Sequence, residues 1–445
     1  MVVRRRYYYW LLKAYFKKWG KIIFFSVFLG GIVFLLLLIG FSYFFLPLVS
    51  DDIEKIGITG SYTASNLPEE VLEHVSYGLT KVSDTQEIKP AASRSWKVSK
   101  DGKIYTIQLK KGQKLSNNKE LTVEMLPYRY KDVTAKIIDP YTLEYHLKNE
   151  FAPFLAVLER PILIKNNGLG DYKITKISQE SGFVKQITLS KKGENKKKIY
   201  YFYPTQEALK TAFMLGEIDQ AEGISKRLSP ESDFKSWKQT EVSKKTDYGR
   251  LVSLFFNTKN DNLGNKKIRQ ALSYALPADF DEGERTYSYI KPQSIYYAKS
   301  PNEGIYDLDL AKSLLDASSS AKIKLEISTS EELEDVAKKI QGEWKKIGVD
   351  SQIKTVSAIP DSFEVLLYSM NLPKDPDMYT VWHSGQPGNL TNYSNVRIDK
   401  LLEDGRQTVN LEQRQAIYAD VQKYLIDDAP TAFLYFPYTY TLKRK

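Results

Sequence analysis

The longest apolar run in the chain lies near its N-terminal end, and shorter alternating patterns follow it. Residues 22–48 carry no charged side chain, and a helix over these 27 residues would extend about 40 Å. That length is enough to cross a bilayer with some tilt. The pattern therefore predicts one transmembrane helix.

A βαβ pattern stands out in the C-terminal half. Apolar residues alternate in "AKIKLEIST", which predicts a strand, and "EELEDVAKKIQGEWKKIG" then places its apolar residues on one helical face up to a stop at Gly348. A further strand follows in "VDSQIKTV", and "FEVLLYS" has the nearly continuous apolar character of a buried parallel strand. Strand, crossover helix and strand indicate a parallel sheet and an α/β fold.

Local turn and capping signals predict further elements in the first half. A "KDG" turn at Lys100–Gly102 joins two alternating runs as a hairpin, and a second hairpin turns at Gly193. A helix is expected to begin near Pro68, and another covers 206–215 and ends at Gly216.

The net charge of +10 is concentrated before the apolar run. Seven cations precede that run and the first acidic residue is Asp51, so the remaining chain has only a small positive excess. A nucleic-acid partner is therefore not supported. By the positive-inside rule, residues 1–21 form a basic cytoplasmic tail and the bulk of the chain lies outside, in a periplasm or at the cell surface. The seven cations are Arg4, Arg5, Arg6, Lys13, Lys17, Lys18 and Lys21.

The end of the apolar run decides how the chain is attached. The sequence "FLPLVSDD" lacks the small-residue pattern of a cleavage site, which favours an uncleaved signal anchor at 22–48 over a cleaved signal peptide. The chain has no cysteine, which excludes lipid attachment through that residue and any disulfide. The tail also mixes Arg and Lys with Tyr and Trp, which suits an interfacial segment on anionic lipid, or the tail only orients the helix.

Catalytic and metal-binding patterns find little support. The sequence has no G-x-S-x-G, H-E-x-x-H or phosphate-binding loop and only three histidines, so an enzyme is not expected, and neither is a cofactor. Asp375, Asp377 and His383 lie close in sequence, but their spacing fits no closed metal site, and Asp-Pro-Asp is common in turns. We therefore predict no catalytic and no metal-binding residues.

The order of six segments resembles a known family. Over residues 56 to 437 the chain is similar to the extracellular solute-binding proteins of family 5, the oligopeptide-, dipeptide- and nickel-binding components of ABC importers. The segments are "YGLTKVSDTQEIKPAASRSWKVSKDGKIYTIQLKKGQKLSNNKELTVEM", "IIDPYTLEYHLKNEFAPFLAVL", "MLGEIDQAEGIS", "LFFNTKNDNLGNKKIRQALSYAL", "DLDLAKSLLDAS" and "YSNVRIDKLLEDGRQTVNLEQRQAIYADVQKYLIDDAPTAFLYFP".

The resemblance implies an α/β fold like that of type II periplasmic binding proteins, with two hinged lobes that close around a solute. The expected first lobe covers 51–256 and includes a reduced extra domain at about 77–160. The second lobe covers 257–420, and residues 421–445 return to the first lobe. In the helix "IRQALSYAL" we expect Arg269 to make a structural salt bridge.

Two departures from the family are informative. Between "LTVEM" and "DVTAKIIDPYTLEYHL" the family usually has several tens more residues, where this chain has only "LPYRYK". Family members that hold a free peptide amine commonly use an Asp shortly before an Asp-Pro pair that matches Asp375 and Pro376. That position falls on Leu372, which cannot make the charge-assisted hydrogen bond.

The resemblance also suggests ligand-binding residues, of which the aromatic ones lie on loops that border the cleft in the family. Tyr and Trp can stack on a ligand and hydrogen-bond it, although each could equally pack between the lobes. The candidates are Tyr62, Asn257, Met370, Asn371, Leu372, Trp382 and Tyr393.

Two functions follow as alternatives. The chain is expected to be a membrane-tethered solute-binding protein that captures peptides or similar solutes for an ABC permease in the membrane. The trimmed domain and the missing Asp favour an alternative, a sensor or envelope scaffold that keeps the fold without transport. A ligand that copurifies or titrates would distinguish them.

Overall fold

The computed structural model consists of an N-terminal unit, residues 1–53 with 193–197, and a body made of the remaining residues. The described residues are 2–40, 52–228, 230–299, 306–318 and 322–445.

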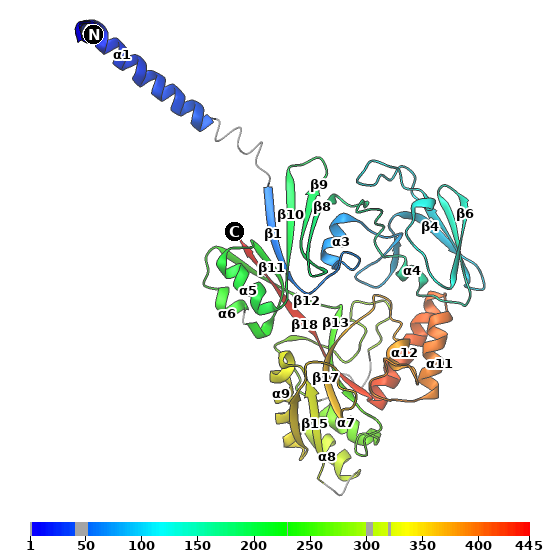
Figure 1. Cartoon of the computed structure of the whole chain (residues 1–445). Helices are drawn as coiled ribbons and strands as arrows, with labels where there is room; N and C mark the ends of the chain where they lie inside the picture. Colours follow the sequence, from blue (N-terminus) through cyan, green and yellow to red (C-terminus); the bar gives the residue numbers. More distant parts are fainter. Residues whose placement is uncertain (1, 41–51, 229, 300–305, 319–321) are drawn as a thin grey trace. The chain divides into compact units, whose positions relative to one another are not determined.

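One long helix, α1 (Val2–Gly40), makes up most of the N-terminal unit (Figure 1). Within the described residues, its Arg6–Gly40 part is the one helix long and apolar enough to cross a membrane. The predicted span, 22–48, overlaps α1 as far as Gly40, and its residues 41–48 lie outside the described residues. The helix begins well before residue 22 because the basic and aromatic tail contains no proline that would break it.

A twelve-stranded sheet runs through the body (Figure 1). Its central strand, β18 (Thr431–Arg444), pairs through its first half with β13 and β14 and through its second half with β11 and β12. The order is β16-β15-β17-β13-β18-β11-β1-β10-β9-β8, with β12 and β14 beside β18. These strands are β1 (Asp52–Thr59), β8 (Tyr172–Glu180), β9 (Phe183–Lys191), β10 (Lys196–Tyr203), β11 (Gln220–Ser225), β12 (Thr240–Thr246), β13 (Arg250–Phe256), β14 (Gly283–Arg285), β15 (Lys324–Thr329), β16 (Asp350–Thr355) and β17 (Val365–Asn371).

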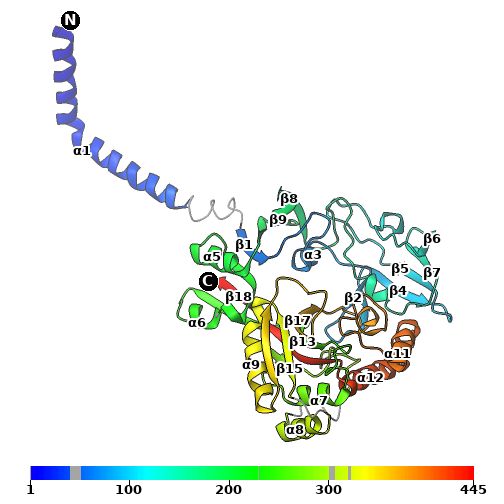
Figure 2. The same cartoon turned by 60° about the horizontal axis from the view of Figure 1, so that its bottom comes forward.

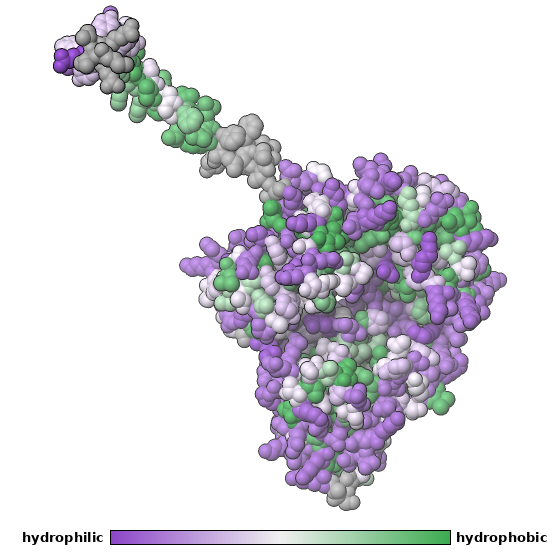
Figure 3. Space-filling model, viewed as in Figure 1, coloured by the Kyte–Doolittle hydropathy of each residue, from purple (hydrophilic) through white to green (hydrophobic). Residues whose placement is uncertain are grey.

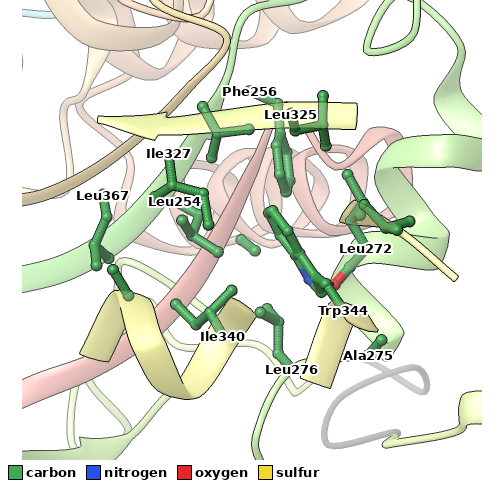
Figure 4. Close-up of a cluster of buried hydrophobic side chains, with 14 of the residues drawn as sticks. Leu254, Phe256, Leu272, Ala275, Leu276, Leu325, Ile327, Ile340, Trp344 and Leu367 are labelled. Carbon is green, nitrogen blue, oxygen red and sulfur yellow. The ribbon is translucent and has the colours of Figure 1, made fainter. Parts of the chain in front are cut away.

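The βαβ prediction is confirmed in the second half of the body. Strands β15 and β16 are parallel, β17 is parallel to β15, and the helix α9 (Glu334–Lys346) connects β15 to β16. The apolar face of α9 is buried against the sheet and against α7 (Lys266–Tyr274). Figure 4 shows Trp344 of α9 among Phe256, Leu272 and Leu276, with its indole Nε1 donating to the Leu272 carbonyl at 3.0 Å.

A second core covers the opposite side of the same strands. It contains the short helix α10 (Tyr379–Trp382) and the helices α11 (Val396–Gln407) and α12 (Leu411–Asp428). The last two lie side by side in both views (Figures 1 and 2). Helix α8 (Leu308–Asp316) packs against α7.

The segment between β1 and β8, the first two strands of the large sheet in chain order, has its own core. A four-stranded antiparallel sheet in the order β4-β5-β7-β6 and the hairpin β2-β3 enclose apolar residues from Leu79 to Ile162. This range is close to that expected for the reduced extra domain, and the "KDG" hairpin is confirmed as β4 and β5. The elements are β2 (Thr80–Val82), β3 (Ile88–Pro90), β4 (Ser93–Val98), β5 (Ile104–Leu109), β6 (Val133–Asp139), β7 (Thr142–Leu147) and α4 (Phe154–Val157).

The remaining predicted helices are also confirmed. Helix α3 (Glu69–Val75) begins after Pro68, and α5 (Gln206–Leu215) is capped at its start by the Thr205 hydroxyl. It ends at Gly216, whose φ of 80° is left-handed and therefore suits glycine. Helix α6 (Pro230–Phe234) packs beside β12.

The second lobe was predicted to begin at residue 257. Strand pairing indicates that the chain crosses from one half of the body to the other before that residue. Strand β13 hydrogen-bonds β17, so residues 250–256 lie in the second half, and α12 runs through residue 421 without a break. The chain passes between halves near Asp247, whose amide donates to the Pro437 carbonyl at 2.9 Å. A strand that forms a ladder with β17 cannot belong to the sheet half on the other side of β18.

Candidate functional site

A cavity of about 280 Å³ lies between the extra-domain side and the second half of the body. One wall comes from the end of α3, from the β2-β3 hairpin and from Glu159. The other wall comes from three loops of the second half. Figure 3 shows a hollow with mostly hydrophilic walls between the upper and lower parts of the body. The lining residues are Glu73, Lys81, Val82, Ser83, Asp84, Gln86, Glu159, Tyr248, Gly249, Tyr289, Ile290, Lys291, Leu372, Pro373, Lys374, Asp375, Pro376 and Met378.

The loop at 286–291 is fixed in place by buried hydrogen bonds. The Ser288 hydroxyl donates to the Gln422 side chain on α12 at 2.8 Å and accepts from the Ile290 amide at 3.1 Å. The Thr286 amide donates to the Leu434 carbonyl on β18 at 3.0 Å. These bonds join the loop to a helix and to the central strand, so the side chains of Tyr289 and Lys291 are held by rigid elements.

Tyr289 contributes to this wall, but its hydroxyl is enclosed in the core of the second half. Its side chain is 4% exposed, and its hydroxyl has no hydrogen-bond partner within the described part of the chain. Burial, with added repulsion from the charges of Asp377 and Asp375, raises the pKa of Tyr289 well above its ordinary value, so the hydroxyl keeps its proton. Leaving this buried donor unpaired costs about 1 to 3 kcal/mol.

Lys291 brings a half-buried cation to the same wall. Its ammonium lies 5.4 Å from the centre of the Tyr248 ring, and it forms no ion pair with any residue that the structure describes. Burial lowers the pKa of Lys291, attraction to Asp84 opposes that shift, and repulsion from Lys374 adds to it. The Tyr248 hydroxyl is already engaged with Glu284 at 2.8 Å.

The loop that follows β17 is held by a buried ion pair. Both Asp375 oxygens accept from the Arg414 guanidinium, at 2.6 and 2.9 Å, and the two side chains are 10% and 6% exposed. Burial lowers the pKa of Arg414, but the Asp375 carboxylate outweighs this and keeps it above its ordinary value. Arg406 pairs in the same way with Asp377, at 2.8 Å. The two arginines of α11 and α12 therefore fix the shape of the 372–378 loop.

Lys374 reaches across the cavity to the other wall. Its ammonium pairs with Glu69 and lies 3.3 Å from a Glu159 oxygen, while its carbonyl accepts from the Gln86 side chain at 2.7 Å. Burial raises the pKa of Glu159, against the attraction of Lys374. Because the Lys374 side chain is 45% exposed, each ion pair contributes at most about 1 kcal/mol.

Of the seven predicted ligand-binding residues, only Leu372 lies on the cavity wall. Its amide donates to the Gly249 carbonyl at 2.8 Å, and the side chain is partly buried. Asn371 is exposed at the end of β17, opposite Arg250, and Met370 is buried in the core. Neither of these two contributes to the cavity wall.

The aromatic candidates pack within the protein. Trp382 is 1% exposed and stacks on Phe255 in the core of the second half. The Tyr393 hydroxyl donates to the Asp428 carboxylate, and Tyr62 packs on Phe202 in the first half with its ring centre 5.1 Å away. Their positions give no support to the predicted ligand contacts.

The other polar candidates also have structural roles. The Asn257 side chain donates to the Phe363 carbonyl at 2.9 Å and accepts from Asn392. Arg269 donates to the carbonyls of Asp428, Ala429, Leu263 and Gly264, so its role is structural, but its partners are backbone oxygens rather than the expected salt bridge. Two of these carbonyls lie in the turn before α7 and two at the end of α12, so the guanidinium joins these two segments.

Asp375, Asp377 and His383, whose sequence spacing did not fit a metal site, each bind a different partner. Asp375 and Asp377 pair with the two arginines already described, and His383 lies 3.3 Å from Glu403 on α11. Within the described ranges, no group of three or more His, Cys, Asp or Glu residues could hold a metal ion.

Sequence reasoning missed Tyr289, Lys291 and Lys374. The first two lie in "ERTYSYIKPQ", where no periodic pattern or cap marks them. Lys374 lies within the loop that was singled out, but its partners are more than 200 residues away in the chain. The one indication of the cavity in the sequence was that the loop containing Lys374 follows a buried parallel strand, where ligands are often bound.

Comparison with known proteins agrees with this architecture. The model of "Bacterial extracellular solute-binding proteins, family 5 Middle" matches residues 87–397. The oligopeptide-binding protein AppA of Bacillus subtilis is 24% identical over 446 residues, which cover 82% of this chain and 81% of AppA. The dipeptide-binding protein of Escherichia coli is 21% identical and covers 79% of this chain and 81% of its own length.

Solved structures share the fold. The ABC transporter substrate-binding protein CtaP of Listeria monocytogenes superposes with a TM-score of 0.75 at 22% identity, covering 89% of this chain and 94% of CtaP. NikZ of Campylobacter jejuni, solved in complex with Ni(L-His), superposes with a TM-score of 0.72 at 21% identity, covering 89% and 95% of the two chains.

Proposed function

Because this chain belongs to family 5 of the bacterial extracellular solute-binding proteins, we propose that it captures a peptide or similar small solute in the cavity described above and delivers it to an ABC importer. The observation that carries the proposal is the position of the cavity, between two halves that are joined by β12, β13 and β18. A hinge at these strands would open and close the walls around a solute.

The size of the cavity favours a short solute. Binding sites for small molecules usually measure about 300 to 1,000 Å³, and this cavity of about 280 Å³ is just below that range. Leu372 lies on its wall, and the nearby Asp375 is fully engaged by Arg414. Neither residue therefore offers a free carboxylate to the amino group of a peptide.

We expect the full-length protein in detergent micelles to be stabilised by some members of a library of di-, tri- and tetrapeptides. A ligand present at a hundredfold excess over its Kd stabilises the folded protein by about 2.7 kcal/mol. The measurement is the thermal unfolding midpoint, followed by mass spectrometry of what copurifies. We also expect free amino groups to be preferred only weakly over acetylated ones, since Leu372 cannot form an ion pair with the amine and the other carboxylates that line the cavity include Glu73 and Asp84.

Two variants sharpen this test. Leu372→Asp is expected to shift the preference toward free amino groups, whereas Leu310→Asp, at a position that is 37% exposed on α8, should leave it unchanged. Capture of peptides is refuted when no peptide raises the midpoint and nothing copurifies.

We further propose that α1 anchors the protein in the cell membrane, with residues 1–21 in the cytoplasm and the body outside. The apolar part of α1 and the cations that precede it support this orientation. We expect the chain to stay in the membrane pellet after carbonate washing and a version without residues 1–51 to be released. Protease added to intact spheroplasts should digest the body, and protection of the body would contradict the orientation.

A sensor or scaffold that does not transport is the second candidate. The contacts of Lys374 with Glu69, Glu159 and Gln86 join the two walls directly, which favours a body held closed by its own side chains. The peptide experiment separates the two functions, because a scaffold would show no ligand-dependent stabilisation.

A further inference from the structure

Helix α1 is longer than a membrane span requires. It has 39 residues, so it extends about 58 Å, whereas the hydrocarbon core of a bilayer is about 30 Å thick. Its uncharged part, residues 22–40, alone extends about 28 Å. Because charged side chains are costly in hydrocarbon, the basic residues before position 22 lie outside the core when the rest of α1 crosses it.

The basic part of α1 has two opposite faces. Successive residues of a helix are about 100° apart, and within residues 6–21 an arc of about 80° contains four cations. These cations are Arg6, Lys13, Lys17 and Lys21. The arc on the other side contains five apolar or aromatic residues and no charge. They are 42% to 59% exposed and comprise Tyr8, Leu11, Leu12, Tyr15 and Trp19.

Two residues depart from this division without placing a charge on the apolar face. Trp10 lies on the basic face, and its ring centre is 5.9 Å from the Lys13 ammonium. Lys18 lies between the two faces, with its ammonium 5.5 Å from the centre of the Trp19 ring. Tryptophan and lysine are both common where a membrane meets water, so these contacts suit a helix at the level of the lipid head groups.

The basic part and the apolar part of α1 do not share one straight axis. Figure 2 shows α1 bent between its first and second halves. Gly20 lies near the middle of the helix, and glycine weakens a helix and is a common cause of a bend. A bend here lets the first half lie along the membrane surface while the second half crosses the membrane.

We propose that residues 6–21 form an interfacial helix that binds the head groups of anionic lipids on the cytoplasmic surface of the membrane. The apolar face lies at the boundary of the acyl chains, and the basic face is directed toward phosphates and water. No acidic residue precedes Asp51, so no carboxylate on this part of the chain neutralises the basic face. The inference rests on the proposed anchoring by α1 and is independent of what the cavity holds.

The other role open to the basic tail is to orient α1. Orientation requires an excess of positive charge on one side of the membrane and does not depend on which helix face holds it. Separation of the cations from the apolar residues is therefore the feature that favours a lipid surface as the partner.

The test uses the absence of cysteine, which allows one nitroxide label at a chosen position. Leu12→Cys and Ala14→Cys lie at nearly the same height on the helix but about 160° apart. The full-length protein is placed in lipid nanodiscs of phosphatidylcholine with about a third phosphatidylglycerol. Electron paramagnetic resonance then measures collisions of each label with oxygen, which enters the bilayer, and with a water-soluble nickel chelate.

We expect the label at position 12 to collide mainly with oxygen and the label at position 14 mainly with the chelate. In nanodiscs of phosphatidylcholine alone, or at high salt, where the Debye length falls to about 3 Å, the label at position 12 should become accessible to the chelate. Equal accessibility of both labels in the anionic nanodiscs would refute the interfacial helix. Oxygen contact at position 12 that is the same with and without phosphatidylglycerol would refute the binding of anionic head groups.

A variant of identical composition is the matched control. Exchanging two pairs of residues, through Arg6→Tyr with Tyr8→Arg and Tyr15→Lys with Lys17→Tyr, keeps the length and net charge but mixes the faces. We expect the difference between the labels at positions 12 and 14 to be lost, while protease still digests the body on intact spheroplasts. A difference that persists in this variant would show that the faces are not its cause and would refute the proposal.

A third label separates this inference from the proposed anchoring. A nitroxide at Leu35→Cys, in the apolar half of α1, should collide with oxygen whatever the tail does. If it is accessible to the chelate, both the anchoring and the interfacial helix fail. If it is in lipid while positions 12 and 14 are both in water, only the interfacial helix fails.

Discussion

Replacing Arg414 with glutamine is expected to lower the free energy of unfolding by about 3 to 5 kcal/mol. The change leaves Asp375 without its partner, although that carboxylate is only 10% exposed. Arg414 also donates to the Gly405 carbonyl at 2.8 Å and so connects α11, α12 and the 372–378 loop. Urea denaturation of the full-length protein, followed by circular dichroism, measures the loss.

Two further variants test whether the unpaired charge of Asp375 causes the loss of stability in Arg414→Gln. Arg406→Gln removes a partner that is 30% exposed and makes a single bond to Asp377, but it leaves that carboxylate, which is 8% exposed, without its ion pair, so we expect an intermediate loss of about 1 to 3 kcal/mol. The double variant Arg414→Met with Asp375→Leu removes both charges and should recover much of the stability lost in Arg414→Gln. If the double variant is as unstable as Arg414→Gln, the loss of stability comes from the changed shape of the site and not from the unpaired charge.

The Arg414 variant is also expected to change ligand binding. Asp375, Pro376 and Leu372 line the cavity, and the ion pair fixes their loop. Loss of the pair should weaken every bound peptide, because it disturbs the shape of the wall.

Truncating Trp344 to alanine is expected to cost about 3 to 5 kcal/mol, because the indole is fully buried in the core shown in Figure 4. It fills the space between α9, α7 and the strands that carry Phe256 and Leu325, so its removal leaves a cavity at the centre of the βαβ unit. Urea denaturation detected by circular dichroism is the measurement, since the substitution removes a fluorophore.

The variant Trp344→Phe is the matched control. It keeps an aromatic ring but loses the hydrogen bond to the Leu272 carbonyl, so we expect a loss of about 1 to 2 kcal/mol. Trp344 lies on the other side of the sheet core from the cavity, and peptide affinity in folded Trp344→Phe should be unchanged. An alanine variant as stable as the phenylalanine variant would contradict the packing argument.

Local patterns in the sequence were sufficient for the elements that depend on neighbours in the chain. The βαβ unit from Lys324 to Thr355 follows from the period of its apolar residues, and α5 follows from its stop at Gly216. The ligand residues stay a prediction: loop position alone could not show that Trp382 packs inward or that the Tyr393 hydroxyl is engaged by Asp428.

The sequence by itself therefore determined the apolar helix, the α/β class and the family, because each is encoded by the order and period of residues along the chain. Only the tertiary structure determined which side chains form the walls of the cavity. Lys374 meets Glu159, and Arg414 meets Asp375, across separations that no local pattern records. Which charged groups of the cavity wall remain available for a solute depends on which of them have already been paired in this way.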